Sequence, residues 1–216
     1  MRKKHMLALV LCFTLFLSLS SIAAAQVAII DYVGFAWEDG GILPSNPGDV
    51  MAFTAVATQI DAMFGVDLQT DEVTVYVSDL ISTGEVFFAP LTYVGYVGGH
   101  IEVYADPLND HDWGTLPPNG QLGTFTNGTL LLAGDFTSFT LGLDATGAGS
   151  FEGLIDGVGG TVANTCTGCE FTFGGAFGRD IAQMPDGYDL QIDGVLEVDE
   201  SVSTESKSFG AVKALY

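Results

Sequence analysis

The sequence predicts a single all-β domain, either an antiparallel β-sandwich or a jelly-roll-like fold of about nine to eleven strands. Almost every segment after residue 26 has the period-2 alternation or the β-branched and aromatic composition of strands. The 28 glycines separate these segments at intervals of about ten residues. Only residues 60–64 and 210–216 have the character of a helical turn. The pattern therefore favours many short, turn-linked strands around one core.

The first 25 residues predict a cleaved signal peptide. Arg2, Lys3 and Lys4 form a basic start, an apolar stretch covers 6–19, and the small residues 23–25 place cleavage before Gln26. The apolar stretch is short for a membrane span, which needs about 20 residues. We therefore expect a secreted, periplasmic or cell-surface protein whose acidic β-domain covers residues 26–200.

The strands expected in the first half are rich in Val, Ile, Tyr, Phe and Thr. Residues 27–37 end at a Gly- and Pro-rich loop, and residues 51–58 follow it. Residues 73–77 alternate cleanly, residues 85–97 are aromatic and β-branched, and residues 100–104 form a short strand after two glycines. Each boundary is set by turn residues.

The second half contains four more strand-like segments. Residues 130–143 form either one long strand or a pair split near Asp135. Residues 149–158 and 188–198 each contain an Asp-Gly turn signal, and residues 170–173 have a clean period of two. From residue 201 the composition becomes polar, which predicts a flexible tail (201–216) with a short apolar end.

The charge distribution excludes several functions. Between Gln26 and Gly178 there is no lysine or arginine, whereas the same stretch carries 19 aspartates and glutamates. After cleavage the net charge becomes −24. Such a chain cannot clamp phosphates, and it repels nucleic acid and anionic membrane surfaces. Divalent cations are the natural counter-charge for its carboxylates.

The loop after the strand at 100–104 is the best candidate for metal binding. Asp106, Asn109, Asp110 and Asp112 supply the hard oxygen ligands that calcium prefers. The spacing lacks the acidic twelfth position of an EF-hand, so we predict a weak site with an affinity on the order of 10⁻⁴–10⁻³ M. The alternative is a solvated turn, because Asp, Asn and Gly are also the ordinary turn residues.

Carbohydrate binding is suggested by the two tryptophans. Trp37 and Trp113 lie at predicted strand ends or loops, where they could stack on sugar rings. The alternative is that these aromatic side chains fill the core, as most of the 15 phenylalanines must. A glycan is therefore a candidate ligand.

The mature chain has two cysteines, Cys166 and Cys169. No second Cys pair or His pair accompanies them to form a zinc site, and a strand pattern follows where a thioredoxin-like motif would open a helix. We predict a local disulfide in an oxidising compartment, which stabilises the fold by about 2 kcal/mol.

No catalytic motif is present, since neither G-x-S-x-G nor H-E-x-x-H occurs. Two carboxylates could still meet as they do in glycosidases, so a secreted hydrolase remains an alternative. An outer-membrane barrel is a further alternative. Its strands would alternate apolar and polar residues, but several segments, such as 86–89 and 130–133, are apolar on both faces.

Residues 74–80, 99–106 and 125–134 resemble a pattern in uncharacterised exported bacterial β-proteins, some of which carry PEP-CTERM sorting tails. The chain lacks the Pro-Glu-Pro signal, the apolar helix and the basic end of such tails. The resemblance implies an extracellular or envelope role and no known reaction.

These observations lead to three functional hypotheses. The first is a non-catalytic secreted or envelope protein with a structural, adhesive or matrix role, supported by calcium and contacting itself or envelope and matrix polymers. The second is a carbohydrate-binding module, and the third is a hydrolase.

Overall fold

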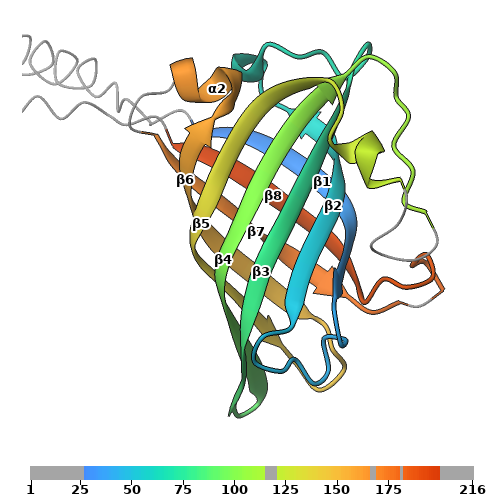
Figure 1. The fold of residues 1–216 in the computed structure, drawn as a ribbon, viewed down its shortest axis with the longest axis vertical. Coiled ribbons are helices and arrows are strands. Elements are labelled where there is room, and N and C mark those ends of the chain that lie inside the picture. Colours follow the sequence, from blue (N-terminus) through green and yellow to red (C-terminus); the bar gives the residue numbers. More distant parts are fainter. Residues whose placement is uncertain (1–26, 115–120, 166–168, 181, 200–216) are drawn as a thin grey trace, which may run out of the picture.

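A computed structural model describes residues 27–114, 121–165, 169–180 and 182–199. Its eight strands form a closed antiparallel barrel in which each strand pairs with its sequence neighbours and β8 pairs with β1 (Figure 1). The predicted all-β architecture is confirmed. The sandwich or jelly roll of nine to eleven strands is wrong, because the sheet closes on itself instead of folding into two layers. The predicted signal peptide (1–25) and tail (201–216) lie outside the described residues.

In the described ranges the strands are long, and three short helices accompany them. They are β1 (Val27–Glu38), β2 (Val50–Ile60), β3 (Glu72–Phe88), β4 (Leu91–Asp106), β5 (Thr129–Leu143), β6 (Gly149–Gly159), β7 (Glu170–Gly178) and β8 (Leu190–Asp199). The helices are η1 (Ala62–Phe64), η2 (Leu122–Phe125) and α2 (Gly160–Thr165). None of the helices among the described residues is long and apolar enough to cross a membrane.

Three strands expected at 73–77, 85–97 and 100–104 are in fact two. The chain turns at Ala89 and Pro90, in the middle of the segment that was expected to be one strand. Gly98 and Gly99 do not end a strand but lie inside β4, both with positive φ. A Cβ at Gly99 would lie 2.4 Å from Leu80 Cδ2, so the strand can pass there only because the residue is glycine.

Aromatic rings fill the middle of the barrel. Inward-facing positions alternate with outward-facing ones along each strand, and the inward set is almost entirely apolar. Phe53 is fully buried at the centre, with its ring 5.5 Å from that of Phe139, 5.6 Å from that of Phe151 and 5.9 Å from that of Phe173. An eight-stranded barrel is just wide enough for such side chains to fill it.

The connections between strands close both ends of the barrel. We call the end that carries the β3–β4 hairpin in Figure 1 the lower end and the opposite end, with α2 and η1, the upper end. Phe64 of η1 and Val162 of α2 join the core from above, and Ile42 of the β1–β2 loop joins it from below. The core therefore extends beyond the strands into the loops.

The outward faces of the strands carry most of the polar side chains. Asp31, Glu152, Asp193 and Glu197 all occupy outward positions on β1, β6 and β8, between inward-facing apolar residues.

Candidate functional site

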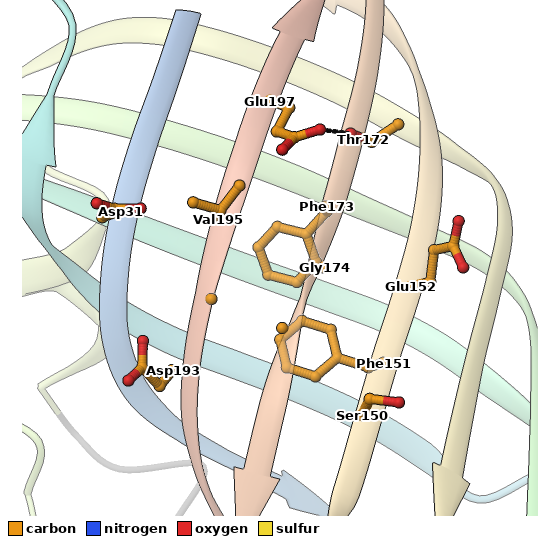
Figure 2. A pocket seen from close by; sticks show the side chains of 12 residues that line it. Asp31, Ser150, Phe151, Glu152, Thr172, Phe173, Gly174, Asp193, Val195 and Glu197 are labelled. Atoms are coloured by element: carbon orange, nitrogen blue, oxygen red, sulfur yellow. Dashed lines mark hydrogen bonds between the residues drawn. The ribbon is translucent and has the colours of Figure 1, made fainter. Parts of the chain in front are cut away.

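An open groove lies on the outer face of β6, β7, β8 and β1. It has a volume of about 670 Å³. Figure 2 shows Glu152 on one side of it, Asp31 and Asp193 on the other, and Glu197 with Thr172 toward one end. We call this hollow the acidic groove. Its lining residues are Asp31, Ser150, Phe151, Glu152, Thr172, Phe173, Gly174, Gly175, Asp193, Gly194, Val195 and Glu197.

Glycines and a buried tyrosine form the floor of the acidic groove. Gly175 of β7 pairs with Gly194 of β8, so no side chain separates the two backbones there. Tyr32 of β1 lies beneath them and stacks on Phe173 with ring centroids 4.9 Å apart. A Cβ on Gly194 would lie 2.6 Å from the Tyr32 hydroxyl. Glycine at this position is thus required for the ring to pack under the groove.

The Tyr32 hydroxyl donates a hydrogen bond to the carbonyl oxygen of Gly174, at 3.2 Å. Burial, and secondarily the negative charge of Asp193, raise the pKa of Tyr32 well above its ordinary value. The tyrosine therefore stays neutral and acts as a strut between β1 and β7.

The electrostatic character of the acidic groove follows from its four carboxylates. Glu152, Asp193 and Glu197 are exposed, and Asp31 is half-buried. Thr172 Oγ1 donates to Glu197 Oε2 at 3.4 Å. Arg179 is the only lysine or arginine among the described residues, and its aliphatic stem packs near Gly147 in the β5–β6 connection at the lower end. The lining of the groove thus carries four acidic side chains and no lysine or arginine.

A second polar cluster is buried at the lower end of the barrel. The Tyr96 hydroxyl donates to Glu38 Oε2, and the Glu38 backbone N–H donates to Asp189 Oδ2 at 2.9 Å. Glu38 is 4% exposed, and its Oε1 has no hydrogen-bond partner. Burial is the main cause that raises the pKa of Glu38, and the nearby carboxylates of Asp49 and Asp189 add to it.

The predicted calcium loop does not gather its carboxylates at one point. Asp112 Oδ1 accepts from the Gly114 backbone N–H at 2.9 Å, and Asp110 Oδ1 accepts from Asn127 Nδ2 at 3.2 Å. Asn109 is exposed and has a positive φ of 49°. Within the described residues, no three His, Cys, Asp or Glu side chains form a group that could hold a metal ion. The loop is mostly built as a series of turns.

Asp106 is the exception in this loop. Its side chain is 4% exposed, and Oδ1 accepts from the Leu108 backbone N–H at 3.0 Å. Oδ2 is buried without a hydrogen-bond partner, and so is Asn127 Oδ1. The two residues belong to adjoining segments, because a Cβ on Gly128 would lie 3.0 Å from the Asp106 Cβ. Two buried acceptors without donors thus lie on adjoining segments.

Glu72 is a further buried carboxylate that the sequence did not single out. It pairs with Asp106 across β3 and β4 and is 5% exposed. Its Oε2 accepts from the His111 backbone N–H at 3.0 Å, and its Oε1 contacts His111 Nδ1. His111 therefore anchors the β4–β5 connection to the barrel wall.

The two tryptophans lie in an aromatic cluster outside the barrel wall. Trp37 is 6% exposed and packs edge-on against Tyr188, with ring centroids 5.6 Å apart. Trp113, from the β4–β5 connection, packs edge-on against Phe35 at 4.8 Å. The Tyr188 hydroxyl donates to the Trp113 carbonyl oxygen. Their rings therefore hold two long loops against β1. Stacking of Trp37 and Trp113 on sugars stays a prediction.

Cys169 takes part in a disulfide bond, whereas Cys166 lies outside the described residues. The predicted Cys166–Cys169 pair thus stays a prediction. His100, which was expected to begin a strand, lies inside β4, where its Nδ1 is 2.7 Å from Asp135 Oδ1 on the outer surface.

The sequence reasoning missed the acidic groove as a site. Asp193 and Glu197 share one face of β8 by their spacing, and this much could have been seen in the sequence. Asp31 and Glu152 join them only because β8 pairs with β1 and β7 pairs with β6.

Fold and groove together define an up-and-down β-barrel with an apolar interior and an acidic outer groove. The chain matches no family model, no curated protein and no solved structure. The resemblance to exported bacterial β-proteins therefore stays a prediction.

Proposed function

We propose that this protein is an exported, non-catalytic binding protein with an adhesive or matrix role, and that its acidic groove holds a chain bearing several cationic amines, such as a basic peptide segment. The observation that carries the proposal is the groove itself, in which four carboxylates line one open hollow with no lysine or arginine among its lining residues.

The affinity would come from several weak contacts acting together. An exposed ion pair contributes only about 0.2–1 kcal/mol, because water screens it and long side chains lose freedom. Four carboxylates in one groove can each meet a cation of an extended chain. The strongly negative field of the mature chain would also attract such a ligand and speed its association.

The test is a calorimetric titration of the mature chain with oligolysine at low ionic strength, which measures the dissociation constant. The groove variant D31N/E152Q/D193N/E197Q should weaken binding by tenfold or more. The matched control changes four exposed aspartates outside the groove, D39N/D67N/D79N/D186N, which removes the same net charge.

The two variants separate a site from general attraction. If both weaken binding equally, the ligand responds only to the net charge and the groove is not a site. If neither variant changes the binding, the proposal fails altogether.

Carbohydrate binding and hydrolysis are the alternatives. Ser150, Thr172 and the carboxylates could bond sugar hydroxyls, although the acidic groove has no exposed aromatic ring to stack on a sugar. Saturable binding of a neutral glycan that the groove variant abolishes would replace the proposal with this function. Turnover of a glycan lost in the same variant would favour the hydrolase.

We also propose that calcium supports the β4–β5 connection through Asp106 Oδ2 and Asn127 Oδ1, with Asp110 alongside. Buried oxygen acceptors without donors are costly, and a cation would satisfy both at once.

Millimolar calcium should raise the melting temperature of the wild type by a few degrees over EDTA, and it should not do so in Asp106→Asn. Asp112→Asn serves as the control within the same loop. An unchanged wild-type melting temperature, or an equal rise in Asp106→Asn, would show the idea to be wrong.

A further inference from the structure

The β3–β4 hairpin projects beyond the rest of the lower end of the barrel (Figure 1). Its tip carries three consecutive exposed apolar residues, Val86, Phe87 and Phe88, whose side chains are 66%, 71% and 75% exposed. Phe87 and Phe88 point to opposite faces of the hairpin. Because both are exposed, the tip stands clear of the core on both sides.

The outer face of the hairpin carries three apolar cross-strand pairs, with Thr83 and Gly95 lying between the first pair and the other two. The pairs are Ile81 with Val97, Val86 with Tyr93 and Phe88 with Leu91. They face outward because Val94 and Tyr96, which alternate with them, face the core. We call these six residues the apolar ladder. Such a concentration of exposed apolar side chains on a monomer marks an interaction surface.

The hairpin also has an open backbone edge. Pairing of β2 with β3 ends at Val50 and Ile81, and the hydrogen bonds of the β1–β2 loop to β3 reach as far as Glu85. The other edge is occupied, because β4 pairs with β5 from Thr92 onward. Among the described residues, no strand pairs with the outer edge of β3 at 86–88. This edge offers unpaired N–H and C=O groups.

We propose that the open edge of β3 pairs antiparallel with the same edge of a second copy of this chain, so that the two apolar ladders join in one sheet. This interaction is independent of the ligand proposed for the acidic groove. Antiparallel pairing of identical edges is an isologous two-fold contact, in which one surface complements itself.

Charge favours the hairpin as the place where two copies meet. The mature chain is strongly negative, yet Glu85 is the only charged residue between Ser82 and Gly99. Its Oε1 is already engaged by the Ser45 backbone N–H at 3.0 Å. Because the hairpin projects from the barrel, antiparallel pairing of two tips directs the acidic bodies away from each other. Repulsion between the bodies is therefore smallest in this arrangement.

A lipid surface is the other candidate occupant, and the open edge argues against it. Unpaired backbone groups cannot be satisfied in the hydrocarbon region, whereas another strand satisfies them directly. The contact area of one strand edge is small, so we expect a weak, concentration-dependent dimer.

The experiment is sedimentation equilibrium of the mature chain over a wide concentration range. The variant V86K/F88K should weaken dimerisation at least tenfold, although its added positive charge would by itself favour association of acidic bodies. The matched control L154K/V158K makes the same chemical change at exposed outer positions of β6. Circular dichroism and melting curves verify that both variants remain folded.

A cross-linking measurement keeps the proposal testable if V86K/F88K fails to fold. Val86→Cys should form a disulfide-linked dimer under mild oxidation at least tenfold faster than Leu154→Cys, because antiparallel edges bring two copies of position 86 together. A monomer at every concentration, or equal cross-linking at both positions, would overturn the proposal. Flotation of a monomeric protein with neutral phosphatidylcholine vesicles, lost in V86K/F88K, would overturn it in favour of lipid.

Discussion

The apolar ladder and the acidic groove lie on the outer face of the same barrel, yet their chemistry is opposite. The ladder presents Val86 and Phe88 to solvent on a hairpin with one charged residue. The groove presents four carboxylates over a floor of glycines. The groove and the Ile81–Val97 end of the ladder both rest on the apolar core, whereas the tip of the hairpin at Val86 and Phe88 stands clear of it. The core fixes the barrel, and this leaves the outer positions free to differ in function.

The largest expected effect is on stability. An aromatic ring inside the barrel should contribute far more to the free energy of unfolding than one on its outer surface. Phe53→Ala should lower the free energy of unfolding by about 3–5 kcal/mol, because it leaves a cavity among the three rings that pack against Phe53. Phe88→Ala should change it by about 0.5 kcal/mol or less. Denaturant unfolding at low protein concentration measures both, and equal losses would mean that the ladder packs against the barrel after all.

Salt should have opposite effects on the interactions of the two outer regions. Raising the salt concentration from about 0.01 to 0.5 M shortens the screening length from about 30 Å to a few ångströms. Oligolysine binding to the acidic groove should therefore weaken by tenfold or more, whereas self-association through the ladder should strengthen as repulsion between the bodies is screened. The calorimetric titration measures the first interaction, and sedimentation equilibrium measures the second. If salt weakened both interactions or strengthened both, the chemistry proposed for one of the two surfaces would be wrong.

A smaller effect concerns Glu38, a carboxylate that lies inside the lower end instead of on the outer face. Its folded-state pKa is raised mainly by burial, so the charged form costs stability above that pKa. The cost disappears as the pH falls through the folded pKa toward the ordinary value of 4.5. Glu38→Gln, which keeps an acceptor for the Tyr96 hydroxyl, should melt a few degrees higher than wild type at pH 7.

The gain in Glu38→Gln should shrink toward pH 4, where the wild-type carboxyl is protonated as well. Asp39→Asn, on an exposed neighbouring side chain, provides the control. If Glu38→Gln melts lower at pH 7, the charge of Glu38 stabilises the lower end and the sign of the effect is reversed.

The sequence predicted the strands better than their connections. The segment at 27–37 corresponds to β1, and 130–143 is one long strand, as the first of two alternatives had it. The turn at Ala89 and Pro90 was missed because the residues around it are as apolar as a buried strand. Gly98 and Gly99 were taken as a break because glycine usually ends strands, but here it lets β4 bend past Leu80.

The candidate sites were harder to predict for a physical reason. A loop rich in Asp and Asn can bind a cation or form turns, and the residue types are the same in both cases. Trp37 could lie on a platform or under a loop, and only the position of Tyr188 decides between them. The exposure of Val86 and Phe88 could not be predicted from the sequence either, since apolar residues are expected to be buried.

The sequence by itself determined that the chain forms an antiparallel all-β domain with strongly acidic character. Alternation fixes which side chains share a face, and the absence of lysine and arginine over most of the domain requires no structure to see. The tertiary structure alone decided that the sheet closes, because strands of a sandwich and of a barrel have the same alternation. Closure depends on register shifts, such as those after Ser82 and Phe136, that bend the strands. Pairing of β8 with β1 then unites Asp31 and Asp193 in one groove, since a contact between the two ends of a chain cannot be inferred from local pattern.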